Sequence, residues 1–347
     1  MFFTRLKRRK QNVNVLKSSL LVLAILTAGC QDDEPEVESF EPIDHSEGLE
    51  EISLALNSNP NAGHGGYYAA QLSDYYVAAG LGVTIKPSDS NATVVQQIDR
   101  GEAMFGVTSA DQMLLGRAEG AKVVAVLAPL QTSPRCIMVH EKSGIRSFED
   151  LQDLTLAINS GATWAKFLQQ KLPLSNVQIV DGPSVATFLA DDGYAQQAYV
   201  FLEPFIAKEN GGNPHSLLVS DLGFNPYTNV LITSEETLRK NPRLVQRMLG
   251  TCLWGWQQYL ESPEETNRHI HELNPKMSLD ILAFGAASMQ SLCIDEKTPV
   301  EYLGRMTAER WNRLAQQLVE IGAVEEGAVN PAEAWSPDVY PGEETPK

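Results

Sequence analysis

The sequence is poor in cysteine, and the few cysteines do not form a recognisable motif. It has 4 cysteines in 347 residues. Those after Cys30, at Cys136, Cys252 and Cys293, do not have the spacing of zinc ligands. In an oxidising compartment Cys252 and Cys293 could form a disulfide, and three buried thiols are an equally open alternative.

Positive charge and clustered histidine are also scarce. The chain carries 27 Lys and Arg residues against 44 Asp and Glu residues, for a net charge of −17. Without a basic stripe to neutralise phosphates, this composition disfavours nucleic acid as a partner. The 6 histidines are scattered, and the spacing of His269 and His271 places them on different faces of a helix. We therefore expect no metal site and no cofactor.

The longest N-terminal apolar run, LLVLAILTA at residues 20–28, is too short for a membrane-spanning helix of about 20 residues. Six basic residues precede it, and no acidic residue occurs before Asp32. This pattern predicts an export signal, and LTAGC resembles a bacterial lipobox in which Cys30 is lipidated. The alternatives are an ordinary signal peptide and a cytosolic chain with a chance apolar start.

Residues 30–50 are acidic, contain proline and have few apolar side chains. They are expected to form a disordered tether between the lipid and the folded part. Removal of the signal peptide, residues 1–29, would leave 21 basic against 44 acidic residues. We therefore expect an exported protein at the periplasmic face or cell surface, anchored to a membrane through Cys30.

The rest of the chain is long enough for two lobes, each with its own core. Short β-rich runs alternate with helical stretches, which predicts an α/β fold with parallel sheets flanked by helices. The same alternation restarts near residue 147, which predicts a second lobe, and the chain becomes mainly helical from about residue 234. The expected strands are 52–56, 82–88, 104–110, 122–130, 176–182 and 195–203, and residues 147–161 are expected to form a short helix and then a strand that ends at Ser160. The expected helices include 66–80, 91–102, 110–121, 162–172 and 184–193.

In open α/β sheets, ligands bind beyond the carboxyl ends of the strands, so the strand-to-helix turns are the places to search. The first turn, NSNPNAGHGG, has neither a dinucleotide-binding glycine pattern nor a phosphate-binding Lys-Ser/Thr pair. It instead carries amides, a histidine and aromatic rings, a combination that suits a small, flat, polar heterocycle. The candidate residues here are Asn57, Asn59, His64, Tyr67 and Tyr68.

Later turns repeat this arrangement. Ser109 lies at the end of one expected strand, and Ser160, Thr163 and Trp164 lie at or after the end of another. At both places a helix begins, and its N–H groups can meet a carbonyl or an anion. Each is also an ordinary helix cap, but the recurrence of the pattern in both lobes favours binding.

Glu203 ends an apolar strand in the expected second lobe, where its carboxylate can accept N–H groups of a ligand or pair with a surface lysine. Tyr227 and Asn229 precede a strand expected to return to the first lobe. No nucleophile with a base and an orienting group emerges, and no G-x-S-x-G motif is present. We therefore expect a binding protein and not an enzyme.

Several stretches resemble the substrate-binding proteins of ABC importers, in the group that binds the thiamine pyrimidine precursor, nitrate, sulfonates or taurine. They are LNSNPNAGHGGYYAA, IDRGEAMFGVTSADQMLLGRAEGAKVVAVLAPLQTSPRCIMV, SGIRSFEDLQDLTLAI and EPFIAKENG. The resemblance runs over most of residues 51–260. The first stretch is most similar to the pyrimidine-precursor branch, although Asn57 stands where that branch has an acid and Ser58 where it has tryptophan.

The resemblance implies a two-lobed periplasmic binding protein fold of type II, with the ligand between lobes joined by two crossover strands. Lobe 1 would comprise residues 51–137 and, with the C-terminal helices, 232–347, and lobe 2 residues 138–231. It implies a monomer that works with an ABC permease and an ATPase.

The expected ligand is a small nitrogen heterocycle. The thiamine pyrimidine precursor comes first and a riboflavin-like ligand next, because QQAYVFLEPF and LGFNPYTN resemble relatives thought to import riboflavin. The alternatives are a nitrate-, alkylsulfonate- or taurine-binding protein, for which Arg135 is the local cation, a pyrimidine-synthesis enzyme of the fungal branch, and a sensor-like binder without a transporter.

Overall fold

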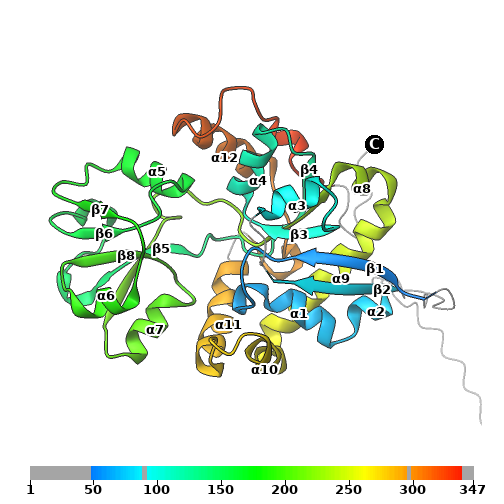
Figure 1. Cartoon of the computed structure of the whole chain (residues 1–347), viewed down its shortest axis with the longest axis horizontal. Coiled ribbons are helices and arrows are strands. Elements are labelled where there is room, and N and C mark those ends of the chain that lie inside the picture. Colours follow the sequence, from blue (N-terminus) through cyan, green and yellow to red (C-terminus); the bar gives the residue numbers. More distant parts are fainter. Residues whose placement is uncertain (1–47, 88–91, 295–297, 338–347) are drawn as a thin grey trace, which may run out of the picture. The chain divides into compact units, whose positions relative to one another are not determined.

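The computed structural model describes residues 48–87, 92–294 and 298–337 (Figure 1). The predicted signal peptide, Cys30 and nearly all of the predicted tether lie outside these residues. Within the described residues, no helix is both long enough and apolar enough to cross a membrane.

The first sheet contains five strands in the order β2-β1-β3-β10-β4. Strands β1, β2 and β3 pair in parallel, whereas β10 runs antiparallel to both β3 and β4, so four of the five strands share one direction. This confirms a mostly parallel sheet and the predicted return of the chain after Asn229. The strands are β1 (Glu50–Ala55), β2 (Leu81–Lys86), β3 (Phe105–Thr108), β4 (Val123–Leu127) and β10 (Val230–Ser234).

The helix expected at residues 66–80 is two helices in the structure. Asp74 adopts a left-handed conformation (φ 56°) and divides the segment. The helices that flank this sheet in the first part of the chain are α1 (Gly65–Leu72), α2 (Tyr75–Ala78), α3 (Val94–Asp99) and α4 (Ala110–Ala118), and a short 3-10 turn, η2 (Ala62–His64), precedes α1.

The second sheet has the order β7-β6-β8-β5-β9, and again a single strand, β5, runs against the other four. β5 and β10 are the first strands after the two connectors between the sheets, residues 128–134 and 219–229. The elements are β5 (Arg135–His140), β6 (Thr155–Ala157), β7 (Gln178–Val180), β8 (Tyr194–Tyr199), β9 (Pro214–Leu218), α5 (Thr163–Lys171), α6 (Val185–Ala190) and α7 (Glu203–Glu209).

The C-terminal part is helical, as the sequence predicts. Its long helix α9 packs against α1 in the core of lobe 1, the first sheet with its helices. The helices are α8 (Glu235–Lys240), α9 (Pro242–Glu261), α10 (Glu264–Leu273), α11 (Leu279–Cys293) and α12 (Ala308–Glu320). Ser234 caps α8 through a hydrogen bond from the Thr237 amide.

The glycines of the first turn serve the packing of α1 against α9. A Cβ atom on Gly66 would lie 2.2 Å from the Trp256 ring, and one on Gly255 would lie 2.1 Å from the Gly66 carbonyl oxygen. Neither distance is compatible with a side chain, so the two helices approach closely only because both positions are glycine. The glycine-rich character of this stretch is therefore explained by helix packing.

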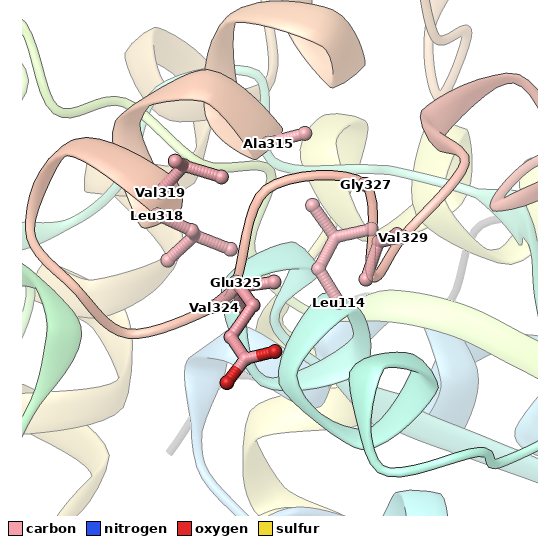
Figure 2. Close-up of a pocket in the computed structure, with 8 residues that line it drawn as sticks. All are labelled: Leu114, Ala315, Leu318, Val319, Val324, Glu325, Gly327 and Val329. Carbon is pink, nitrogen blue, oxygen red and sulfur yellow. The ribbon is translucent and has the colours of Figure 1, made fainter.

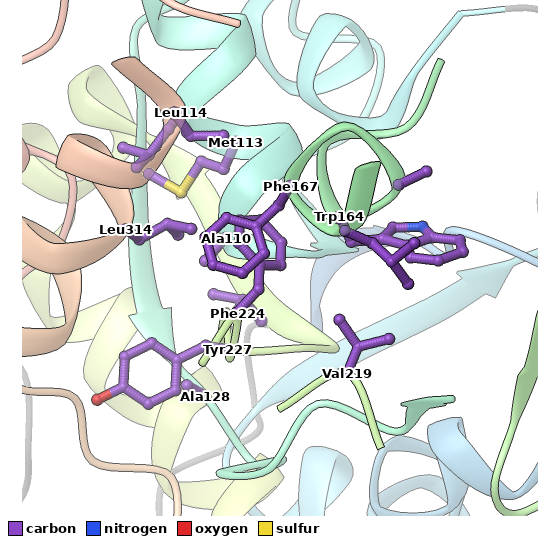
Figure 3. Close-up of a cluster of buried hydrophobic side chains, with 14 of the residues drawn as sticks. Ala110, Met113, Leu114, Ala128, Trp164, Phe167, Val219, Phe224, Tyr227 and Leu314 are labelled. Atoms are coloured by element: carbon purple, nitrogen blue, oxygen red, sulfur yellow. The ribbon is translucent and has the colours of Figure 1, made fainter. Parts of the chain in front are cut away.

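A continuous apolar cluster extends from α4 in lobe 1 to α5 in lobe 2, the second sheet with its helices (Figure 3). Met113 and Leu114 come from α4, Trp164 and Phe167 from α5, and Phe224 from the second connector, and all five side chains are buried. The two lobes thus share one of their apolar cores.

The three cysteines that the structure describes, Cys136, Cys252 and Cys293, are buried free thiols, which decides the alternative left open by the sequence. The Cys252 sulfur lies 3.6 Å from the Tyr76 hydroxyl. Burial raises the pKa of Cys136, Cys252 and Cys293, in the case of Cys252 to about 12, so these thiols are poor nucleophiles.

Candidate ligand-binding site

A network of side-chain amides joins the turn after β1 to the connector before β10. Asn57 Oδ1 lies 2.8 Å from His64 Nε2, and Asn57 Nδ2 donates to Asn229 Oδ1 at 3.3 Å. Asn229 Nδ2 donates to the Gly63 carbonyl, and the Tyr67 hydroxyl donates to the Asn229 carbonyl at 2.8 Å. The structure thus brings together four residues that the sequence predicts for the site.

His64 is neutral in this network. Its side chain is 1% exposed, and burial lowers its pKa to about 4. Because the Asn57 amide nitrogen donates to Asn229, its oxygen is the group facing His64, and His64 Nε2 must carry the proton. Nδ1 is then an acceptor, and it is buried without a hydrogen-bond partner among the described residues.

Asp111 at the start of α4 connects the two lobes. Thr163 at the start of α5 donates its hydroxyl to Asp111 Oδ2 at 2.6 Å. The guanidinium of Arg135, the first residue of β5, lies 3.9 Å from Asp111 Oδ1. Asp111 is 1% exposed, so this carboxylate is a buried charge that meets its partners from the other lobe.

The Asp111–Arg135 pair is ionised. Burial by itself raises the pKa of Asp111, but Arg135 and hydrogen bonds from Ser109, Thr163 and the Gln112 amide outweigh it and hold the pKa below its usual value. Burial by itself lowers the pKa of Arg135, and the Asp111 carboxylate with the Tyr199 phenol outweighs it. The positive charge of Arg135 is thus paired with the Asp111 carboxylate inside the protein.

The sequence predicted that Glu203 ends a strand, and this prediction is wrong. Strand β8 ends at Tyr199, and Glu203 begins α7, with Pro204 at a helical position that needs no N–H donor. Glu203 Oε2 accepts the Tyr199 amide at 2.7 Å, and burial raises the pKa of Glu203. The carboxylate therefore closes the turn between β8 and α7.

The turn between β8 and α7 reaches lobe 1. The ring of Phe201 is buried in the lobe 1 core, and a Cβ atom on Gly63 would lie 3.5 Å from it. Phe205 at the start of α7 stacks on Phe284 of α11, with ring centroids 4.9 Å apart.

The other predicted residues have separate environments. Asn59 is exposed, and its carbonyl accepts from Asn61 Nδ2. Ser160 contacts Asp181 through its amide and its hydroxyl. The remaining three are buried aromatic side chains. Tyr68 packs beside His269, and Trp164 lies within the apolar cluster of Figure 3. Tyr227 packs beneath the Arg310 guanidinium.

Two cavities lie away from these residues. One of about 20 Å³, room for a single water, is lined by Leu114 and by residues of α12 and the following loop (Figure 2). The other, of about 280 Å³, lies in lobe 2 and is lined by residues within 139–154 and 192–195. In the described residues no three potential metal-binding side chains are grouped.

Sequence reasoning missed Asp111 and Tyr199, and assigned Arg135 only to a sulfonate alternative. Asp111 stands in the first turn of a helix, where acidic residues are common because they complement the helix dipole. Tyr199 lies inside a strand pattern. The signal available for both was their position at a strand end, directly after β3 for Asp111 and at the end of β8 for Tyr199.

Solved structures with the same fold include binding proteins and also the desulfurization enzyme DSZB, which is similar with a TM-score of 0.56 at 14% identity, over 83% of this chain and 97% of that chain. The periplasmic aliphatic sulphonate binding protein SsuA from Escherichia coli is similar with a TM-score of 0.63 at 17% identity, over 86% of this chain and 96% of that chain. This likeness confirms the periplasmic binding protein fold predicted from the sequence.

Sequence relatives include both a binding protein and an enzyme. The riboflavin-binding protein RibY of Chloroflexus aurantiacus is 23% identical over 95% of this chain and 98% of its own. The 4-amino-5-hydroxymethyl-2-methylpyrimidine phosphate synthase THI11 of Saccharomyces cerevisiae is 25% identical over 67% of this chain and 74% of its own. Residues 61–266 match the family described as NMT1/THI5 like, and the chain belongs to this family of substrate-binding proteins and their relatives.

Proposed function

We propose that this protein is the ligand-binding component of an ABC importer and captures a small, flat nitrogen heterocycle between its two lobes. One observation carries the proposal: strand-end turns of the two lobes meet. The turn after β3 meets the turn after β6 through the Asp111–Thr163 hydrogen bond, and the turn after β1 meets the turn after β8 where Gly63 lies against Phe201. Carboxyl ends of strands are where open α/β sheets bind ligands.

The polar groups at this meeting place suit a neutral heterocycle. The buried His64 ring has an acceptor nitrogen without a partner among the described residues, and side-chain amides lie beside it. A sulfonate or nitrate would need a free cation or a pocket rich in N–H groups, and the local cation, Arg135, is already paired with Asp111. The charge balance therefore favours the heterocycle over the anions.

Two heterocycles are the leading ligands. The sequence of the first turn favours an aminopyrimidine such as the thiamine precursor. The relative RibY, which aligns over nearly the whole chain, favours an isoalloxazine. Ser58 stands where the pyrimidine-binding branch has a tryptophan, and the small side chain leaves room for the larger ring.

The N-terminal pattern supports the remaining parts of the proposal. A lipidated Cys30 would hold the protein at the outer face of a membrane, and residues 30–50 would give the folded part reach toward a permease and its ATPase. Globomycin treatment of expressing cells, which blocks lipoprotein signal cleavage, should cause the uncleaved precursor to accumulate. A Cys30→Ala variant that is released and processed identically to the wild type would contradict lipidation.

The enzyme alternative is tested in the same preparation. The yeast relatives are named as synthases, and a synthase that consumes its own histidine would leave His64 modified. Mass spectrometry of protein incubated with candidate precursors should find His64 intact and no pyrimidine product. A modified His64 would favour the enzyme.

A thermal-shift panel tests the ligand. Hydroxymethylpyrimidine, formylaminopyrimidine, thiamine, riboflavin, nitrate and taurine are added separately. A ligand at 100 times its Kd adds about 2.7 kcal/mol to the free energy of unfolding, which raises the melting temperature measurably. We expect a shift with a heterocycle, and a shift only with nitrate or taurine would overturn the proposal.

Glu203→Ala is expected to weaken heterocycle binding about tenfold, because it frees the β8–α7 turn that reaches lobe 1. The matched control is Glu209→Ala at the exposed end of the same helix, which should bind as the wild type does. Isothermal titration with the ligand identified in the panel measures both variants. Equal affinity in all three proteins would remove Glu203 from the site.

A further inference from the structure

Tyr199 is the exposed member of an aromatic pair at the end of β8. Its side chain stacks on Phe201, with ring centroids 5.5 Å apart and an interplanar angle of 21°. Phe201 is 6% exposed, whereas Tyr199 is 37% exposed. Phe201 thus supports Tyr199 and leaves part of the tyrosine ring accessible.

Tyr199 is linked to both polar parts of the site, the Asp111–Arg135 pair and the amide network around Asn229. Tyr199 pairs directly with Arg135 across the antiparallel strands β8 and β5, so both side chains lie on the same face of the sheet. Arg135 in turn faces Asp111 from lobe 1. On the other side, Phe201 lies against Gly63, whose carbonyl belongs to the amide network around Asn229.

We propose that Tyr199 is the specificity-determining aromatic surface of this site, on which the flat ring of a nitrogen heterocycle stacks. The inference rests on the proposed function and adds a residue to it. Tyr199 would supply the stacking surface that Ser58 does not provide.

Two features fit Tyr199 for this role. Its ring is fixed by Phe201 behind it and by Arg135 beside it, so little side-chain entropy is lost when a ligand stacks. A ring face attracts any flat π-system but gives a tetrahedral sulfonate no comparable contact. The surface would therefore select planar rings and accept both a pyrimidine and the larger isoalloxazine.

The competing explanation is that Tyr199 only supports Arg135. Two substitutions separate the roles: Tyr199→Phe keeps the ring without the hydroxyl, and Tyr199→Gln keeps a polar group beside Arg135 without the ring. Tyr199→Leu removes both. Tyr302→Leu is the matched control. Tyr302 is an exposed tyrosine, as Tyr199 is, and it also has an arginine neighbour, Arg305, whose guanidinium lies over the Tyr302 ring.

The experiment measures melting temperatures and the Kd values for hydroxymethylpyrimidine, riboflavin and taurine by isothermal titration. Stacking of a ring on an aromatic side chain contributes enough that its loss weakens binding about tenfold or more. We expect the Phe variant to bind the planar ligand within about threefold of the wild type. The Gln and Leu variants should bind it at least about tenfold more weakly, and Tyr302→Leu should bind it normally.

Two results would overturn the inference, and they are distinguishable. A folded Gln or Leu variant that binds the planar ligand as tightly as the wild type would refute the role of Tyr199 and leave the proposed function standing. If wild-type protein binds taurine and neither planar ring, the proposed function itself is wrong, and the stacking role falls with it.

Discussion

The charge of Asp111 is expected to contribute several kcal/mol to stability. Asp111→Asn removes the negative charge and keeps an oxygen that accepts from Thr163, so the substitution isolates the pairing with Arg135. Removing one partner of a buried ion pair costs about 3–5 kcal/mol. Because the Arg135 side chain is 17% exposed, we expect the lower end, about 3 kcal/mol, and a melting temperature lower by about 6 °C.

Urea denaturation of four proteins measures the coupling: the wild type, Asp111→Asn, Arg135→Met and the double variant. Removal of both charges leaves neither one buried alone, so the double variant should be far more stable than the sum of the single effects implies. We expect a coupling free energy of about 2 kcal/mol or more. Strictly additive losses would refute the claim that Asp111 and Arg135 stabilise each other.

The same pair predicts a pH dependence. The pKa of Asp111 is lowered in the folded protein, so its contribution to stability is fully present above the unfolded-state pKa of about 4. The contribution is lost as the pH falls from there through the lower folded-state pKa. The stability difference between the wild type and Asp111→Asn should therefore narrow below about pH 4. A constant difference from pH 7 to pH 3 would contradict the assignment.

His64 and the α1–α9 contact carry the remaining predictions. The pKa of His64 is lowered from 6.5 to about 4, so the unfolded chain binds the extra proton, and the contribution of His64 to the free energy of unfolding should fall by about 3 kcal/mol as the pH falls from 6.5 to 4. A His64→Gln variant should lack that dependence in urea titrations, and a persistent slope would assign it to other groups. Gly255→Ala should lose about 3 kcal/mol because its Cβ meets the Gly66 carbonyl, whereas Gly250→Ala on the same helix, where a Cβ meets nothing within 4 Å, should gain about 0.5–1 kcal/mol. Equal effects at the two positions would contradict the close-packing explanation.

The fold could be predicted from the sequence because its signals are local. Buried β-rich runs such as 123–127 and the regular alternation with helices defined both sheets. Errors arose where tertiary context decides the conformation. Asp74 breaks a helix that the apolar spacing would continue, and β8 ends at Tyr199 although the apolar residues run on to Leu202. Phe201 and Leu202 are apolar because they pack on lobe 1.

The site was predictable only in part. The positions at strand ends identified Asn57, His64 and Asn229, which the structure joins although 172 residues separate the first from the last. Asp111 and Arg135 could not be paired from the sequence, because their contact depends on how α4 meets β5 across the lobes. A contact of that kind has no periodicity to reveal it.

The connectors between the lobes are held by a separate set of contacts. Arg310 of α12 donates to the Gln131 side chain at 3.1 Å and to its carbonyl at 2.7 Å, and it donates to the Asn225 carbonyl at 3.0 Å. Its guanidinium also lies 3.7 Å from the centre of the Tyr227 ring. One side chain from lobe 1 thus fixes both connectors, residues 128–134 and 219–229.

This division suggests how a ligand would enter. The contacts at the connectors are partly buried, and they join the connectors to lobe 1, so they can persist while the lobes separate. The contacts at the proposed site instead join lobe to lobe, through the Asp111–Thr163 hydrogen bond and the Phe205–Phe284 stack. Opening would have to break these contacts as well as the Asp111–Arg135 pair and the apolar cluster that α4 shares with α5. A bound ligand that touches both lobes would favour the closed state, because its binding stabilises that state alone.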